Sequence, residues 1–419
     1  MSQYNPHRRQ FLSVAMLAGL AGSCAAPAVA LAPRQDDTAR ISGRFCIPIY
    51  AQRRFPMPSD TASVLAVLDA ASGRIEYHPS AVFNLHGLAE PGTTNPEQLK
   101  FGVGHANPEQ LEIFDAGFKR MQTRLFEGLT FRGHGLGHPE GVLTTAGITG
   151  QEHKGGVLLL LDGAGQELHR AATGGLRPHE IVDCGSFYAI AHYGDRARAY
   201  DAPRSTVVIN GLELALDFDL VAPSVSFLDK TSLEVVAVHE LPLTGAITHL
   251  AAAGEGEVLA MGMNALHFND LNDLYVMAAK DDATLLPSEL ATLRYERYVP
   301  MYRVSCKGGV GVECYEPAST MRRGQSFAMD PQTGICAATY AASQTLFLRV
   351  PGKGDRMLNT LNFGVADPRG CTVIPGTGLV AVAGNSDNIA VLDGQSGALV
   401  KLYGLPLGGH SHMYWWPST

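Results

Sequence analysis

The chain has 419 residues, of which 46% are hydrophobic and 17% charged, so it can bury a large core in one big domain or in several smaller ones. Its 46 glycines and 24 prolines favour many short strands joined by tight turns over long helices. The formal net charge of −8 makes nucleic acid a poor candidate partner.

The first thirty residues have the pattern of an export signal. Arg8 and Arg9 precede a short apolar run, and a small-residue cleavage site, AVA, ends at Ala30. This predicts a twin-arginine signal over 1–30 and a periplasmic mature protein. The apolar run is shorter than the about 20 residues of a membrane-spanning helix, so we expect no transmembrane segment. A lipoprotein beginning at Cys24 is the less favoured alternative.

Seven cysteines less Cys24 leave six in the mature chain, in a compartment that allows disulfides. Cys306 and Cys314 flank Gly-Gly-Val-Gly, and a turn at these glycines predicts a disulfide across a hairpin. The others show no C-x-x-C spacing, which argues against zinc-ribbon and thioredoxin-like chemistry. Their pairing is left open: Cys46, Cys184, Cys336 and Cys371.

One short phrase recurs seven times along the chain. Each copy begins with a histidine or a small polar residue, continues with a short apolar strand and ends at a Pro/Gly turn. Successive leading residues are 48, 45, 70, 77, 45 and 41 positions apart, and four of these spacings match the roughly 40 to 50 residues of one propeller blade. The leading residues are His86, His134, His179, His249, Ser326, Cys371 and His412.

A second phrase falls between these copies and predicts the outer part of a blade. An apolar strand ends in aspartate, a short turn follows, and another strand begins, as in a β-hairpin. The phrase occurs at 63–75, 111–117, 156–168, 224–236 and 388–400.

Together these phrases predict an all-β fold, a seven-bladed β-propeller of the WD40 or YVTN kind over 31–419. The N-terminal strands are expected to join the C-terminal strand at HMYWW, which closes the ring and protects its sheet edges. The two long spacings predict insertions near 194–222 and 267–320, the second with a short amphipathic helix in DDATLLPSELATLRYERY.

The stretches FRGHGLG, GLRPHE, VAPSVSFLDKTSLEVV and DPRGCTVIPGTGLVAVAGNS resemble a family of uncharacterised, twin-arginine-exported bacterial propeller proteins, a domain of unknown function. The similarity covers roughly 60–419. Members of that family commonly accompany imelysin-like, iron-regulated proteins. The resemblance therefore implies a seven-bladed fold, a periplasmic address, a link to iron uptake and iron-uptake proteins as partners, and it implies no established catalytic residues.

Equivalent positions on successive blades of a propeller converge on its axial channel, so the leading residues are expected to meet there. Neutral imidazole and thiolate groups bind transition metals, which predicts a site for iron or copper. The alternative is that these histidines only bond to neighbouring backbone and hydroxyl groups. The candidate metal ligands are His86, His134, His179, His249, Cys371 and His412.

Further polar residues accompany the leading positions. Glu180 would be an oxygen ligand or the acceptor that orients an imidazole. Arginines that precede several leading residues would form a mouth for a small anionic ligand. In the alternative, each arginine pairs with an aspartate of the adjacent blade, such as Asp162 or Asp367. The candidate ligand-binding residues are Arg132, Arg177, Glu180, Arg323, Ser326 and Arg369.

The sequence has no G-x-S-x-G, H-E-x-x-H, Walker or dinucleotide-binding motif. Asp217 and Asp219 alternate on a predicted strand and are interpreted as a solvated face, and His138 is expected in a loop. The predicted function is a periplasmic binding or scaffold protein that handles iron, another metal or a metal chelate. The alternatives are a propeller enzyme, either a lactonase-like hydrolase or a metal-dependent oxidoreductase, and a protein-interaction platform that docks through the two insertions.

Overall fold

The computed structural model describes most of the chain beyond the predicted signal. The chain divides into two units, Met1–Ala32 and Pro33–Thr419, and every described residue lies in the second. Within the described part, no helix has the length and apolarity needed to cross a bilayer. The predicted signal and the helix predicted at 281–298 lie outside it. The described residues are 41–50, 61–92, 99–151, 154–197, 206–209, 212–215, 219–221, 223–241, 246–263, 301–314, 321, 323–406 and 412–417.

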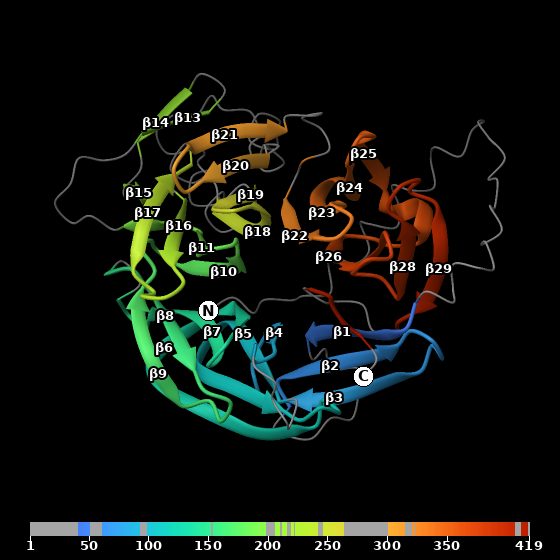
Figure 1. The fold of residues 1–419 in the computed structure, drawn as a ribbon, viewed down its shortest axis with the longest axis horizontal. Helices are drawn as coiled ribbons and strands as arrows, with labels where there is room; N and C mark the ends of the chain where they lie inside the picture. The colour runs from blue at the N-terminus through green and yellow to red at the C-terminus, as the bar shows by residue number, and fades with distance from the viewer. Residues whose placement is uncertain are drawn as a thin grey trace, which may run out of the picture. The chain divides into compact units, whose positions relative to one another are not determined.

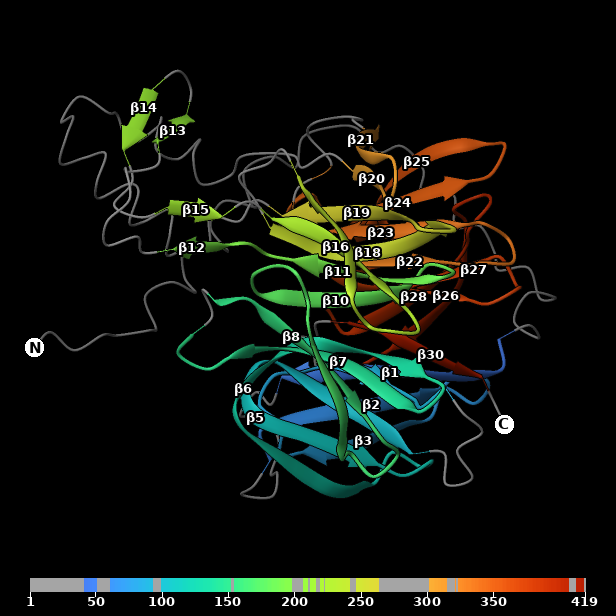
Figure 2. The same ribbon diagram turned by 60° about the vertical axis from the view of Figure 1, so that its left-hand side comes forward.

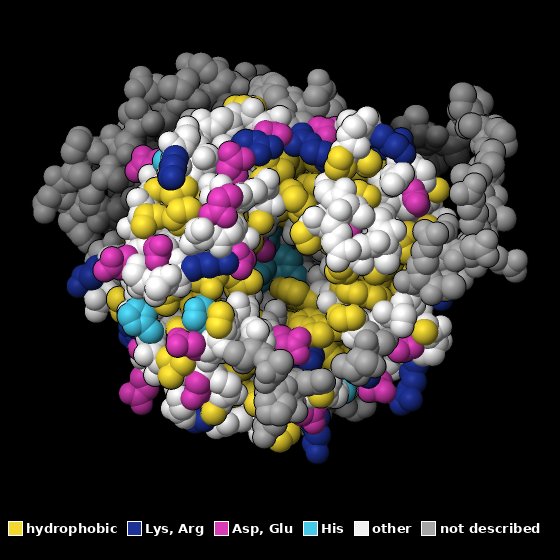
Figure 3. Space-filling model, viewed as in Figure 1, with side chains coloured by type: hydrophobic (Ala, Val, Ile, Leu, Met, Phe, Trp, Pro, Cys, Tyr) yellow, Lys and Arg dark blue, Asp and Glu magenta, His cyan; other side chains and the backbone are white. Residues whose placement is uncertain are grey.

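The described strands form antiparallel β-sheets arranged around a common centre, which is a β-propeller-like architecture (Figure 1). The space-filling view shows a central hollow there (Figure 3). Among the residues that the structure describes, helix is limited to single 3₁₀ turns such as η4 (Ala341–Ser343) and η5 (Thr360–Phe363). Four of the sheets have four strands each, in simple up-and-down order. They are β10 (Pro178–Asp183), β11 (Phe187–His192), β16 (Ser224–Asp229) and β17 (Val235–Glu240); β18 (Ala246–Gly254), β19 (Glu257–Met263), β20 (Met301–Ser305) and β21 (Gly309–Cys314); β22 (Gly324–Met329), β23 (Cys336–Tyr340), β24 (Thr345–Val350) and β25 (Gly354–Asn359); β26 (Pro368–Ile374), β27 (Leu379–Gly384), β28 (Asn388–Asp393) and β29 (Leu399–Gly404).

A fifth sheet joins the two ends of the described chain. Its order is β3-β2-β1-β30, with β30 (Tyr414–Pro417) paired antiparallel to β1 (Gly43–Tyr50). The Trp415 ring packs edge-on against Phe45, with 4.8 Å between the ring centroids. The N-terminal strands therefore pair with the C-terminal strand, as the sequence predicts. The other two strands are β2 (Ser63–Asp69) and β3 (Ile75–Ser80).

The widest sheet has six strands, in the order β4 to β9. Its long strand β6 serves two pairings, because its first half pairs with the second half of β5 and its last residues pair with β7. Two of the seven repeated phrases, those whose leading residues are His86 and His134, thus lie in one continuous sheet. The strands are β4 (Leu85–Ala89), β5 (Lys100–Phe114), β6 (Arg120–His138), β7 (Gly141–Ile148), β8 (Gly156–Leu161) and β9 (Glu167–Ala172).

Neighbouring sheets pack face to face through hydrophobic clusters. Strands in the interior of a sheet are buried on both faces, as in SVLAVLD of β2. The edge strand β17 of another sheet alternates between partly buried and exposed residues. Each fully buried large apolar side chain contributes roughly 1.5 to 3 kcal/mol. One cluster joins the sheet of β26 to the sheet of β1 through Ile389, Val391 and Phe45, so the last four-stranded sheet packs on the sheet that contains both chain ends.

The five aspartate turns predicted from the second phrase are confirmed. In each, the aspartate carboxylate accepts a hydrogen bond from a backbone N–H of the turn, which satisfies a donor that the strands leave unpaired. At the turn between β2 and β3, for example, Ser72 N donates to Asp69 Oδ1 over 2.8 Å. The other four aspartates are Asp115, Asp162, Asp229 and Asp393.

The two predicted insertions differ in what the structure shows. Residues near 194–222 form two small two-stranded sheets, which lie to one side of the larger sheets in Figure 2. The prediction for 267–320 is partly wrong, because 301–314 form the hairpin of β20 and β21 and complete a four-stranded sheet. The small strands are β12 (Asp195–Ala197), β13 (Thr206–Ile209), β14 (Leu212–Ala215) and β15 (Asp219–Val221).

The predicted disulfide between Cys306 and Cys314 is also wrong. The turn begins directly after Ser305, which pairs with Gly309, while Cys314 lies at the far end of the hairpin opposite Met301. Five residues of strand span about 16 Å, well beyond disulfide reach. Cys306 is accordingly a free thiol.

Candidate metal centre

The leading residues sit where the innermost strands depart from regular pairing. In β4, β6, β10, β18, β22 and β26 the register shifts near the leading residue, as at a β-bulge. A bulge bends the strand and re-aims its side chains, so these irregularities decide which residues face the central hollow. His86 is itself the skipped residue between Leu85 and Gly87.

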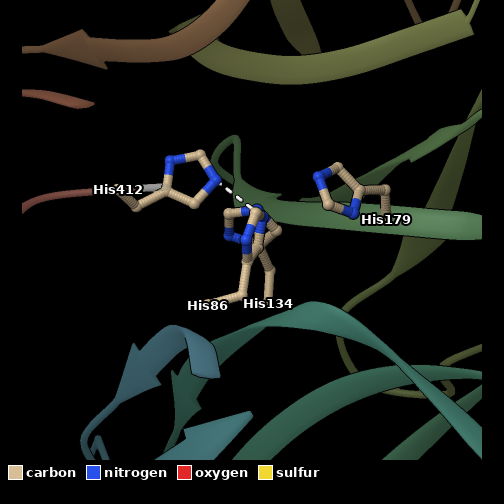
Figure 4. A group of neighbouring side chains, drawn as sticks. All are labelled: His86, His134, His179 and His412. Carbon is tan, nitrogen blue, oxygen red and sulfur yellow. Dashed lines mark hydrogen bonds between the residues drawn. The ribbon is translucent and has the colours of Figure 1, made fainter. Parts of the chain in front are cut away.

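Four predicted ligands, named here the tetra-histidine group, come together at the centre: His86, His134, His179 and His412. One ring nitrogen from each lies within 4.8 Å of the others. His86 and His134 project from the same sheet, while His179 and His412 approach from other sides (Figure 4). Histidine side chains are visible at depth in the central hollow of Figure 3.

All four rings are buried, with between 1% and 8% of each residue exposed. Burial, and then the neighbouring imidazoles, hold the pKa values of His86, His134 and His179 well below the ordinary 6.5. These rings are therefore neutral at neutral pH, and a neutral imidazole carries a nitrogen lone pair that a metal can use. Nitrogens around a tetrahedral ion lie about 3.3 Å apart, so the widest pairs would close by up to about 1.5 Å on binding.

Hydrogen bonds prepare some of these nitrogens and leave others without a partner. His179 Nδ1 lies 2.5 Å from the carbonyl oxygen of Arg132, which only accepts, so Nδ1 carries the proton and Nε2 the lone pair. His86 Nδ1 and His134 Nε2 are buried and have no hydrogen-bond partner among the described residues. His412 Nε2 faces His86 Nε2 at 2.7 Å. Most buried polar side-chain atoms in proteins have a hydrogen-bond partner, so these two nitrogens are exceptions to that rule.

A second group, named here the carboxylate group, shares one ring with the first. It consists of His134, Glu180 and His249, whose ligand atoms also lie within 4.8 Å of one another. His249 Nδ1 is 3.2 Å and His134 Nδ1 is 3.8 Å from the Glu180 carboxylate. The backbone N–H of Leu250 donates to the same carboxylate over 2.6 Å and holds it in place.

One histidine of the centre was missed in the sequence. His105 lies on β5 opposite Arg132, and its ring centroid is 5.1 Å from that of His86 and 4.9 Å from that of His179. Its Nδ1 contacts the Arg132 carbonyl oxygen at 3.1 Å. His105 does not lead a repeat, because it sits on a second strand; the Gly-His pair at 104–105, like that at 133–134, was the available signal.

Glycine at 133 makes this crowding possible. A Cβ atom there would lie 2.6 Å from the His86 ring and 3.3 Å from the His179 ring, and φ is +111°. Both the space and the backbone conformation exclude a larger residue without distortion. Gly133 is thus required by the approach of imidazoles from two sheets.

Cys371 is not part of the centre, contrary to the prediction. Its side chain lies in the hydrophobic cluster between the sheets of β22 and β26, where Sγ contacts the carbonyl oxygens of Ser326 and Ala337 at 3.5 Å. Burial raises the pKa of its thiol to about 12, which opposes the thiolate form that metals bind. Ser326 Oγ accepts from Cys371 N over 3.1 Å, so this pair joins two sheets.

The four predicted arginines have different surroundings. Arg132 is buried, and its carbonyl positions His179 as described above. Arg369 pairs with Asp367 at 2.9 Å, a partner two residues away in the same segment and not across blades. Arg323 is exposed, and Arg177 is partly buried with φ of +54°.

His138 is the last residue of β6, so the loop predicted for it is wrong. It is 9% exposed, and its Nδ1 accepts from Glu140 N over 3.1 Å. It belongs to neither metal-ligand group.

Fold and site together define an all-β, propeller-like protein with a buried polyhistidine centre. No protein-family model matches the chain, and no curated protein matches its sequence. Similar solved structures include hydrazine synthase of Kuenenia stuttgartiensis, with a TM-score of 0.50, 10% identity, and coverage of 82% of this chain and 90% of that one. A protein from Lactobacillus plantarum has a TM-score of 0.50 and 12% identity, and the match covers 90% of this chain and 99% of that one. Apo AztD from Citrobacter koseri has a TM-score of 0.48 and 12% identity, and the match covers 90% of this chain and 100% of that one. The likeness of the first two concerns the fold alone.

Proposed function

We propose that the mature chain is a periplasmic, seven-bladed propeller that binds one divalent transition-metal ion at the tetra-histidine group. The observation that carries the proposal is the meeting of four buried imidazoles, from segments up to 326 residues apart, with nitrogens within 4.8 Å. The periplasmic address rests on the twin-arginine pattern of the first thirty residues.

The count of seven blades is supported by the packing between sheets. The six-stranded sheet divides naturally within β6, since a hydrophobic cluster joins residues of β4 and β5 to residues of β7 and β8. Counted as two blades, it brings the total with the five four-stranded sheets to seven. A hydrophobic cluster then lies at each of the seven junctions, including the one beside the paired chain ends.

Metal binding explains the centre better than a structural role does. Packing several imidazoles together without water is costly, because each ring has one donor and one acceptor to satisfy. Two of the buried nitrogens, His86 Nδ1 and His134 Nε2, have no described partner. A bound ion would accept lone pairs that the folded chain does not otherwise use.

The donor set favours a binding site over a catalytic one. Catalytic zinc sites keep three protein ligands and an open position, whereas closed sites use four protein ligands. The tetra-histidine group offers four. An all-imidazole set suits Zn²⁺ and Cu²⁺, and both bind such sites more tightly than Fe²⁺ does. Because Cys371 lies in a hydrophobic cluster and not in the centre, the centre also lacks the soft thiolate ligand that would favour copper in its reduced state. Iron, the metal that the family resemblance suggests, is therefore less favoured than zinc or copper as the bound ion.

The proposal is tested with the mature chain, 31–419, stripped with a chelator and then dialysed separately against Zn²⁺, Cu²⁺ and Fe²⁺. Elemental analysis is expected to find about one equivalent of Zn²⁺ or Cu²⁺. The double variant His134→Ala, His179→Ala should lose at least about 100-fold in affinity, since each ring supplies a ligand.

The matched control is His138→Ala, because His138 ends the same strand that carries His134 and belongs to neither metal-ligand group. Circular dichroism and a thermal melt establish that each variant is folded. Equal metal content in the double variant and in the control would contradict the proposal, as would a wild-type chain that retains no metal.

A further inference from the structure

The ring of His134 belongs to both metal-ligand groups. Its Nδ1 lies 3.8 Å from Glu180 Oε1 in the carboxylate group, and its Nε2 is buried without a hydrogen-bond partner among the described residues. A neutral imidazole has one lone pair and one N–H, so it can ligate through only one nitrogen at a time. Occupation of one group therefore withdraws His134 from the other.

Electrostatics leads to the same exclusion. Two dications held in adjacent ligand groups repel each other strongly, because little water lies between them to screen their charges. Glu180 is the one carboxylate in the two groups, and one negative charge cannot offset that repulsion. The centre is therefore built for one ion with two positions.

The two groups differ in charge and in access. The Glu180 side chain is 15% exposed, compared with 7% for His134 and 4% for His249. A hydrated cation that enters the hollow is attracted first to this partly exposed carboxylate, which the Leu250 N–H holds in a fixed orientation. With three protein ligands, the carboxylate group leaves a coordination position open for water or a competing chelator, and open positions make exchange fast.

We propose that the His134–Glu180–His249 group is a transfer site through which a single metal ion enters and leaves the tetra-histidine group. This inference rests on the proposed function. The ion binds first to His134, Glu180 and His249, and then moves to the tetra-histidine group. His134 is a ligand in both positions, and Glu180 and His249 are exchanged for the other three histidines.

The test is kinetic, because a transfer site and a merely orienting carboxylate predict opposite effects on release. Glu180→Gln keeps an oxygen that can accept from Leu250 N–H and removes the charge. If Glu180 binds the ion transiently during entry and exit, the variant should take up Zn²⁺ about 10-fold more slowly. It should also release Zn²⁺ about 10-fold more slowly, with little change in Kd. If Glu180 only orients His134, its loss weakens the site and Zn²⁺ leaves faster.

Uptake is followed by stopped flow with Zn²⁺ and a coloured chelator, and release by transfer to excess EDTA. His249→Gln removes a second ligand of the transfer site from a different sheet and should slow both rates as well. The control is Glu140→Gln, which removes an exposed carboxylate next to His138 and belongs to neither group. Its rates should equal those of the wild type.

The outcomes separate this inference from the proposed function. One equivalent of Zn²⁺, with both rates slowed in both variants, supports the transfer site. Faster or unchanged release in folded Glu180→Gln overturns it while the tetra-histidine site stands. Two equivalents in the wild type also overturn it, because exclusion then fails. A wild type that binds no Zn²⁺ overturns both.

Discussion

The central hollow has two unlike sides built on the same repeated strand. On one side, β4, β6, β10 and β18 present histidines that gather within hydrogen-bonding or metal-ligand distance. On the other, β22 and β26 carry Ser326 and Cys371 at the corresponding repeat positions. These two side chains bond to the backbone across neighbouring sheets and leave the centre to the histidines.

The difference shows that a repeat position specifies a place on the scaffold and not a role. Small side chains at this position are used to join sheets, since a hydroxyl or thiol reaches only the nearest backbone. Imidazoles are long enough to reach past the backbone into the hollow. The two sides are therefore expected to respond differently to pH, to steric crowding and to loss of a hydroxyl group.

The largest expected difference is the response to acid. In the metal-free protein His86, His134 and His179 have pKa values well below 6.5 because they are buried among other imidazoles. Below about pH 6.5 the unfolded chain binds protons at these rings and the folded chain does not. The free energy of unfolding should therefore fall as pH drops below about 6.5, by up to about 4 kcal/mol per pH unit for three rings, until the folded-state pKa values are reached.

Urea unfolding of the metal-free protein between about pH 7 and pH 5 measures this slope. His134→Gln should reduce the slope by about 1.4 kcal/mol per pH unit, since one titrating ring is removed. Replacing Ser326, on the other side of the hollow, should leave it unchanged. A free energy of unfolding that is flat across this range would show that the rings titrate normally.

The next effect comes from crowding at Gly133. Gly133→Ala places a methyl group 2.6 Å from the His86 ring and forces alanine to adopt a φ of +111°. We expect a loss of about 3 kcal/mol in the free energy of unfolding, together with reduced metal content, because the rings must move apart. Denaturant unfolding and elemental analysis check both parts.

Gly150→Ala is the control for backbone conformation alone. Its φ is +72°, and a Cβ atom there meets nothing within 4 Å, so about 1 kcal/mol is expected with full metal content. If the two variants behave alike, the crowding seen around His86 has no energetic consequence.

The smallest effect is expected on the side without histidines. Ser326→Ala removes the hydroxyl that accepts from Cys371 N and donates to Cys371 O. The loss of these two buried hydrogen bonds should lower the free energy of unfolding by about 2 kcal/mol. Metal content should stay at the wild-type level, and any decrease would place Ser326 in the metal centre after all.

Much of the fold could be predicted from the sequence because the repeat is local. The aspartate turns and the strand at each repeated phrase need only a few residues of alternating pattern, and both are present in the structure. The limits of the second insertion were misjudged, because the hairpin at 301–314 follows a long stretch that carries no repeated phrase. The Cys306–Cys314 prediction failed for a related reason, since glycines indicate a turn without fixing which residues pair across it.

For the candidate site, the sequence by itself determined that histidines return at blade spacing, since residue type and chain distance are written in it. Only the tertiary structure decided which of them meet, because register shifts of one or two residues choose the face on which each side chain lies. That choice places His86 in the centre and Cys371 in a hydrophobic cluster. It also brings in His105 from a second strand and sets Glu180 against His134 and His249, which no spacing in the chain records.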